Sequence, residues 1–139
     1  MKQALVEKIE SRFLSYSEIL DSCSEEMLHA KLTVTKTKSL ADHFWCVIGA
    51  RESYTIAIKS GKWSGFSCSI NKLNKNKLNF ALKTSASSVL AVIDDISDCD
   101  DTRVALLLSL NEHEVMHEGQ IIRHMYGLGF DIPSSVKWA

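Results

Sequence analysis

The sequence predicts an all-α protein, a four-helix bundle with a long crossover between its second and third helices. Four long segments repeat apolar residues at spacings of three and four, as helices that face a common core do. Helix breakers are rare, because the single proline is Pro133 and there are only six glycines in 139 residues. With 45% hydrophobic residues, the chain is long enough for one domain, residues 1–139, with a real core.

The first predicted helix covers residues 3 to about 22. One side of this segment is apolar at helical spacing (Leu5, Ile9, Phe13, Tyr16 and Leu20). A polar turn follows, residues 27–32 add a short helical turn, and residues 33–38 are β-branched and polar, which predicts a connector.

The second predicted helix covers residues 39–60. Ser39 can cap its first amides, and Gly61 tolerates the left-handed conformation in which helices often end. His43 and Cys46 flank one edge of its apolar stripe, which consists of Leu40, Phe44, Val47, Tyr54 and Ile58.

Residues 62–79 predict an ordered crossover loop. The stretch is too rich in Ser, Asn and Lys for a packed helix, yet its aromatic residues argue against a free linker. About twenty residues are enough to carry the chain back along a bundle. Trp63 and Phe66 are the loop residues expected to set substrate choice.

The third predicted helix runs from about residue 82 to 96 and the fourth from about 102 to 128. Asp101 or Thr102 is expected to cap the fourth helix, and Gly127 or Gly129 to end it. The tail beyond is expected to be extended, with Trp138 packed against the bundle.

The fourth helix carries the residues that indicate chemistry. One face of it changes from leucine to histidine along its length (Leu106, Leu110, His113, His117, Gln120 and His124). His113 and His117 are four residues apart, a spacing at which two imidazoles can bind one cation. The other interpretation is that these are interior histidines, hydrogen-bonded to their neighbours.

The same run matches the HExxH motif of zinc proteases, with Glu114 as the base. A metzincin needs Gly and His three and six residues after the second histidine, but this chain has Gln120 and Arg123 there. Glu114 is also turned by about 100° from His113 around the helix, away from the inner row. A protease is therefore not the favoured interpretation.

The run HEVMHEGQII (residues 113–122), followed by Gly-Leu-Gly and Pro133, resembles the end of DinB/YfiT-like proteins, whose last helix carries HxxxHxGQ. Residues 40–54 are similar to the metal-binding segment of the second helix in that superfamily. The resemblance covers both helices and their spacing, hence most of the chain.

The resemblance implies a bundle in which one ligand from helix two and two histidines from helix four hold a divalent ion, zinc or nickel. The two histidines would be His113 and His117. An ungapped alignment puts the first ligand on Cys46, and His43 lies one turn earlier. Either residue can serve as third ligand, or the site is poor in metal.

Three further residues are candidates for supporting the ligands or the substrate: Glu118, Gln120 and His124. The family likeness also implies a homodimer, and a small-molecule substrate or a low-molecular-weight thiol as partner. Two functions compete. One is a metal-dependent hydrolase or thiol S-transferase, and the other is a non-catalytic binding or stress-response bundle with a degenerate metal site.

Charge and composition exclude other classes. Sixteen basic and seventeen acidic residues leave a net charge of −1, so no dedicated nucleic-acid surface is expected. The first residues contain no uninterrupted apolar core, which argues against a signal peptide or a membrane span. The four cysteines are dispersed without a CxxC pair, so we expect reduced thiols and a cytoplasmic protein.

Overall fold

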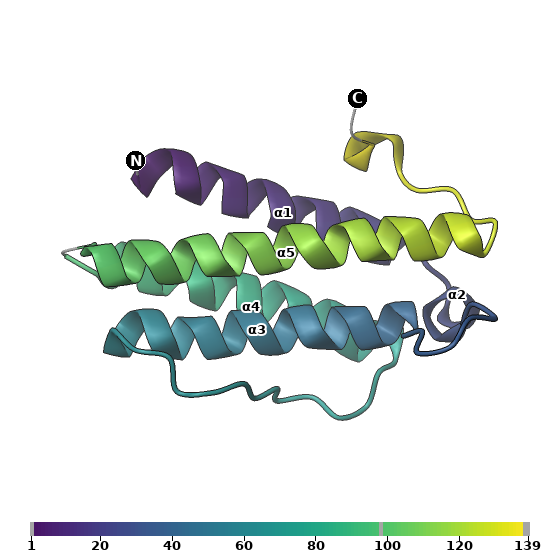
Figure 1. Ribbon diagram of the computed structural model, residues 1–139, viewed down its shortest axis with the longest axis horizontal. Coiled ribbons are helices and arrows are strands. Elements are labelled where there is room, and N and C mark those ends of the chain that lie inside the picture. Colours follow the sequence, from purple (N-terminus) through teal and green to yellow (C-terminus); the bar gives the residue numbers. More distant parts are fainter. Residues whose placement is uncertain (1, 98, 138–139) are drawn as a thin grey trace.

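Four long helices form a bundle, which confirms the predicted fold class (Figure 1). The computed structural model describes residues 2–97 and 99–137, and no strand occurs within them. The helical elements are α1 (Lys2–Ser22), the short α2 (Glu25–His29), α3 (Leu40–Ser60), α4 (Lys75–Asp95), α5 (Asp101–Gly127) and the 3₁₀-helix η1 (Ser134–Val136).

The helix directions explain the long crossover. Figure 1 shows α1 and α5 running one way and α3 and α4 the other, and α3 and α4 are in contact. Parallel neighbours cannot be joined by a short link. The connecting segment therefore returns along α3, where the amide of Ser67 donates to Ser53 Oγ (2.9 Å) and Trp45 Nε1 donates to the carbonyl of Ile70 (2.9 Å).

The predicted ends of α3 are confirmed. Ser39 Oγ accepts a hydrogen bond from the amide of Asp42 (3.1 Å), and Asp42 Oδ2 accepts one from the amide of Ser39 (3.0 Å). This reciprocal capping box satisfies two amides of the first turn. At the other end, Gly61 has a φ of 79°, the left-handed conformation that glycine adopts without strain.

The predicted start of α4 at about residue 82 is wrong, because the helix begins at Lys75. The side chain of Asn74 accepts a hydrogen bond from the amide of Lys77 (3.0 Å) and caps the helix. The polar residues of the first turn are largely solvent-facing, while Leu78 is fully buried. A high Lys and Asn content is therefore compatible with a helix at this position, and the crossover is confined to residues 61–74.

Two other helix starts also differ from expectation. Asp100, and neither Asp101 nor Thr102, caps α5, because its Oδ1 accepts the amide hydrogen of Arg103 (2.9 Å). The short α2 begins at Glu25 instead of residue 27, since Ser24 supplies the capping oxygen. At its far end α5 stops at Gly127, as predicted, and the expected position of Trp138 lies outside the described residues.

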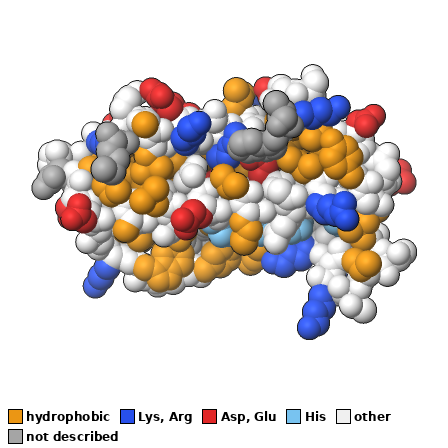
Figure 2. Space-filling view, turned by 45° about the horizontal axis from the view of Figure 1, so that its top comes forward, with side chains coloured by type: hydrophobic (Ala, Val, Ile, Leu, Met, Phe, Trp, Pro, Cys, Tyr) orange, Lys and Arg blue, Asp and Glu red, His pale blue; other side chains and the backbone are white. Residues whose placement is uncertain are grey.

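The charges of the surface, the polarity of the helices and the state of the cysteines can be compared with the expectations from composition. On the face in Figure 2, acidic and basic side chains are dispersed among apolar ones, in keeping with the near-zero net charge. No helix of the described residues combines the length and the apolar character needed to cross a membrane. All four cysteines are free.

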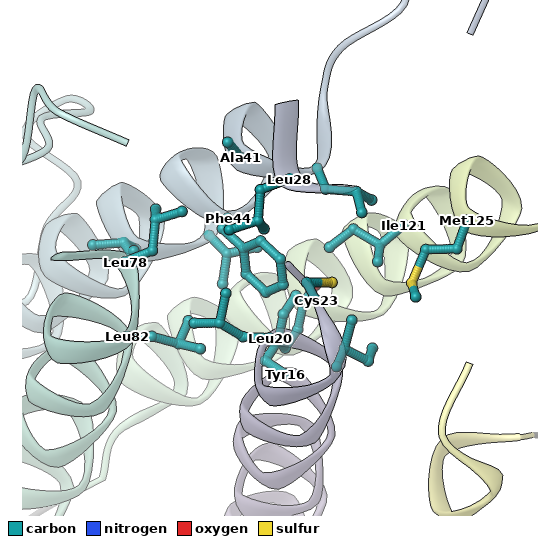
Figure 3. Packing of buried hydrophobic residues seen from close by; sticks show 14 of the residues in the cluster. Tyr16, Leu20, Cys23, Leu28, Ala41, Phe44, Leu78, Leu82, Ile121 and Met125 are labelled. Carbon is teal, nitrogen blue, oxygen red and sulfur yellow. The ribbon is translucent and has the colours of Figure 1, made fainter. Parts of the chain in front are cut away.

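The core consists of two apolar clusters, one toward each end of the bundle. The cluster beside α2 is shown in Figure 3, where Tyr16, Leu20, Phe44, Leu82 and Ile121 converge from α1, α3, α4 and α5. The second cluster lies at the other end and contains Leu5, Ile9, Phe13, Ile58, Val89, Val92, Ile93, Leu107 and Leu110. Every long helix contributes to both clusters, so the four helices hold one another in register.

The capping box gives the first prediction. Ser39→Ala removes the oxygen that accepts the Asp42 amide, and we expect it to lower the free energy of unfolding by about 1 kcal/mol. Urea denaturation measures this loss. Ser88→Ala, at an exposed position inside α4, is the matched control and should cost nothing, because alanine is the better helix former there. Equal losses in both variants would contradict the assigned cap.

Candidate metal centre

Two of the predicted ligands meet between α3 and α5. His43 lies on the first turn of α3, His117 lies on α5, and their Nδ1 atoms are 2.9 Å apart. Both residues are buried, with 7% and 5% of their surface exposed. Since α3 and α5 are neighbouring helices, this contact joins residues 74 positions apart in the chain.

His113 stands one helical turn from His117. The two ring centroids are 4.5 Å apart, as expected for side chains four residues apart on one helix face. His113 Nδ1 is buried and has no hydrogen-bond partner. A buried nitrogen without a partner is uncommon in folded proteins and calls for a physical reason.

Burial keeps the three imidazoles neutral. It lowers the pKa of His43 to about 4 and that of His117 to about 3, and it also lowers the pKa of His113. The ammonium of Lys38 acts in the same direction on all three rings. At neutral pH each ring therefore keeps a nitrogen lone pair, which is the form that binds metals.

Cys46 lies three residues after His43 on α3, but it is not part of the contact with His117. Its Sγ accepts a hydrogen bond from Lys38 Nζ (3.5 Å). Of the two candidates for the third ligand, His43 is the one in contact with His117.

The three supporting candidates have different surroundings. Glu118 is buried, its Oε2 accepts from Arg12 Nη1 (2.6 Å), and its Oε1 has no partner. His124 is buried, and its Nε2 donates to the carbonyl of Ala30 (3.0 Å), so its Nδ1 carries the lone pair when the ring is neutral. Gln120 is exposed at the edge of a cavity.

A cavity of about 690 Å³ opens beside these histidines. The segment 34–38 lines one side of it, and α5 lines the other with Met116, Gly119, Gln120 and Arg123. We predicted only a connector for this segment, because no motif marks it. The sequence signal that could have marked this segment as part of the site is its position directly before the helix that carries His43.

Trp63 and Phe66 do not line this cavity, contrary to expectation. Trp63 packs against Tyr54 (centroids 4.8 Å apart) and Phe66 against Trp45 (5.3 Å), so both hold the crossover on α3. The expectation treated the longest loop as the substrate loop. The helix directions bring the shorter segment to the histidines.

Glu114 also differs from expectation, because the residue that was expected to point away from the inner row is fully buried. It forms a bidentate pair with Arg51 of α3, through Nε to Oε1 (2.7 Å) and Nη2 to Oε2 (2.8 Å). The helix α5 packs against both α1 and α3, so two adjacent strips of it are buried. Sequence reasoning missed Arg51, whose only signal was a charged residue within an apolar helix.

The residues fit a metal in number and chemistry, and partly in position. Two nitrogens bound to one zinc ion at about 2.0–2.1 Å lie no more than about 4 Å apart, and the His43–His117 contact satisfies this limit. In the present side-chain conformations, no three His, Cys, Asp or Glu of the described residues converge on one ion. His113 would have to turn, and its Nδ1 would lose no hydrogen bond by doing so.

Comparison with known proteins supports the fold. No protein-family model matches the sequence, and no curated protein matches it. Among solved structures, the chain is similar to a DinB-like protein, YjoA, from Bacillus subtilis, with a TM-score of 0.72 and 17% sequence identity. The match covers 95% of this chain and 97% of that one.

The Arg51–Glu114 pair gives a prediction on stability. Arg51→Met and Glu114→Leu each leave one buried charge without its partner and should lower the free energy of unfolding by about 3–5 kcal/mol. The double variant leaves no charge and should lose less than either single variant. A double-mutant cycle in urea measures the three values, and additive losses would contradict a direct pairing.

The neutral histidines give a prediction on pH. Their folded pKa values lie below the ordinary 6.5, so the unfolded chain binds more protons between pH 6.5 and about 4. With chelator present, the free energy of unfolding should therefore fall as the pH falls through this range. His117→Asn removes one of these groups and should make the fall shallower. An unchanged slope in that variant would contradict the assignment.

Proposed function

Because the chain has the DinB-like fold, we propose that it is a metal-binding protein in which His43, His113 and His117 hold a divalent ion, zinc or nickel. The observation that carries the proposal is the 2.9 Å contact between the Nδ1 atoms of His43 and His117. It brings nitrogen donors from two helices together, next to a third imidazole with a buried, unpartnered nitrogen.

His43 is preferred to Cys46 as the third ligand. His43 touches His117, whereas the sulfur of Cys46 is engaged by Lys38. The set would then consist of three neutral imidazoles, which suits zinc and nickel alike. A three-ligand protein site leaves positions open for water or substrate.

The reaction would be a hydrolysis or a thiol transfer. A bound divalent ion lowers the pKa of a water or thiol and makes hydroxide or thiolate available near neutral pH. The chain would orient the reactants, since two histidines stand on one rigid helix and the third on its packed neighbour. Gln120 would offer its amide to a substrate in the cavity, and His124, fixed by Ala30, would offer Nδ1.

One observation favours the second candidate, a non-catalytic bundle that binds a small molecule. The 2.9 Å separation also suits a hydrogen bond between two neutral rings, with one Nδ1 donating to the other. The nearby ammonium of Lys38 disfavours any further positive charge on all three histidines. Metal binding has to be stronger than the hydrogen bond between the two rings and the repulsion from Lys38. A direct measurement of metal binding therefore distinguishes the two functions.

The test is zinc or nickel binding by the purified protein. We expect about one ion per chain by elemental analysis, and a rise of the thermal midpoint on adding the metal, because a ligand that binds only the folded state stabilises it. His43→Ala and His117→Ala should abolish both effects.

Cys46→Ser is the matched control on the same helix, and it should bind the ion as the parent does. Loss of metal in Cys46→Ser but not in His43→Ala would assign the third ligand to the cysteine. If the metal content is well below one ion per chain and His117→Ala does not change it, the metal site is rejected. The non-catalytic bundle is then the remaining function.

A further inference from the structure

The charged side chains that line the cavity beside the histidines are all basic. Three basic side chains line it, Lys36 and Lys38 from the connector and Arg123 from α5, and no Asp or Glu does. The chain as a whole carries slightly more acidic than basic residues. The excess of positive charge is therefore a local property of this cavity. Figure 2 shows histidine surface, in pale blue, beside basic side chains in blue on this face of the molecule.

Two of these basic groups are not neutralised by the protein. Neither Lys36 nor Arg123 forms an ion pair within the described part of the chain. Arg103 illustrates the usual alternative, since it pairs with Asp100 (2.9 Å). Basic side chains that share a cavity without a carboxylate repel each other, and an anion placed between them would relieve this repulsion.

The backbone at Lys36 is unusual. Its φ is 59°, and it is the one non-glycine residue with positive φ in the described chain. The left-handed region disfavours every residue that has a Cβ atom, and residues held there are concentrated at ligand-binding sites. Glycine would fit this turn without strain. A lysine thus stands where the backbone conformation alone would favour glycine.

The rest of the lining is largely apolar. Leu32, Val34 and Met116 contribute hydrocarbon surface, and 690 Å³ far exceeds the volume of a bare inorganic anion. Gly119 adds open space, because a Cβ at this position would meet no atom within 4 Å. Glycine inside a helix is otherwise unfavourable relative to alanine. The cavity has room for an organic molecule with an apolar part.

We propose that this cavity binds a small organic anion, whose charged group lies between Lys36 and Arg123 and whose apolar body lies along Leu32, Val34 and Met116. The inference deepens the proposed function, because it rests on the same cavity and names the chemical class of its substrate. Binding of the anion does not itself require the metal. The basic groups belong to the protein, and they remain when the ion is removed.

The test is a titration of the amide NMR spectrum with octanoate, octanamide and octylammonium, which share one chain and differ in charge. With chelator present, octanoate should shift the amide signals of Gly119 and Gln120, and octylammonium should not. Octanamide should bind at least about 3-fold more weakly than octanoate, as expected for the loss of partly exposed charge pairs. Equal binding of all three would overturn the proposal.

Variants of the cavity residues test which basic side chains bind the carboxylate of octanoate. Lys36→Gly and Arg123→Gln should each weaken octanoate binding about 3- to 10-fold. Lys83→Ala, which removes an exposed charge from α4 outside the cavity, is the control and should leave it unchanged. Lys36→Gly should also keep or raise the thermal midpoint, so that weaker binding in this variant does not come from unfolding. Octanoate binding that is unaffected by both cavity variants would overturn the proposal.

Octanoate binding measured with and without zinc distinguishes failure of this inference from failure of the proposed function. Octanoate binding in chelator, together with a protein that takes up no zinc, would support the anion site and reject the metal site. If octanoate binds only after zinc is added, its carboxylate binds the zinc ion and not the basic side chains. That result would overturn the role of the basic residues and support the metal site.

Discussion

The pairing of Arg51 with Glu114 fixes how α3 lies against α5, and the histidine contact depends on that placement. The guanidinium also donates to the carbonyl of Leu82 on α4 (3.1 Å), and its carbon lies 4.2 Å from the ring centroid of Phe13 on α1. All four long helices therefore meet at one buried cation. Such a pair tolerates little sliding, because a displaced carboxylate would leave two charges unsatisfied. It sits between the two apolar clusters and separates them with an ordered polar layer.

The histidines gain their geometry from this layer. His113 and Glu114 are consecutive on α5, so the pair that anchors Glu114 also sets the rotation of the helix that carries His113 and His117. Tyr16 reinforces the same rotation by donating its hydroxyl to the carbonyl of Glu114 (2.6 Å). The candidate site is thus built on rigid, packed elements, which is the arrangement that keeps donor atoms in place. Only the connector at the mouth of the cavity is irregular.

Much of the fold could be predicted from the sequence, because helix periodicity, Ser39 and Gly61 are local signals with local causes. The start of α4 could not, since its first turn is polar and solvent-facing apart from Leu78, and so resembles the crossover in composition. The spacing of His113 and His117 pointed to their common face. Which of His43 and Cys46 contacts His117 depends on the rotation of α3 against α5, which no local pattern encodes. The roles of Arg51 and of Lys36 likewise arise only from contacts between segments distant in the chain.

The burial of Arg51 and Glu114 has one more consequence. Both side chains are completely sealed from solvent, whereas Lys36 and Arg123 are exposed at the mouth of the cavity. Dissolved ions screen exposed charges over about 8–10 Å at physiological ionic strength but act much less on sealed ones. The framework of the bundle should therefore be indifferent to the salt content of its surroundings, while its attraction for charged molecules would vary with it.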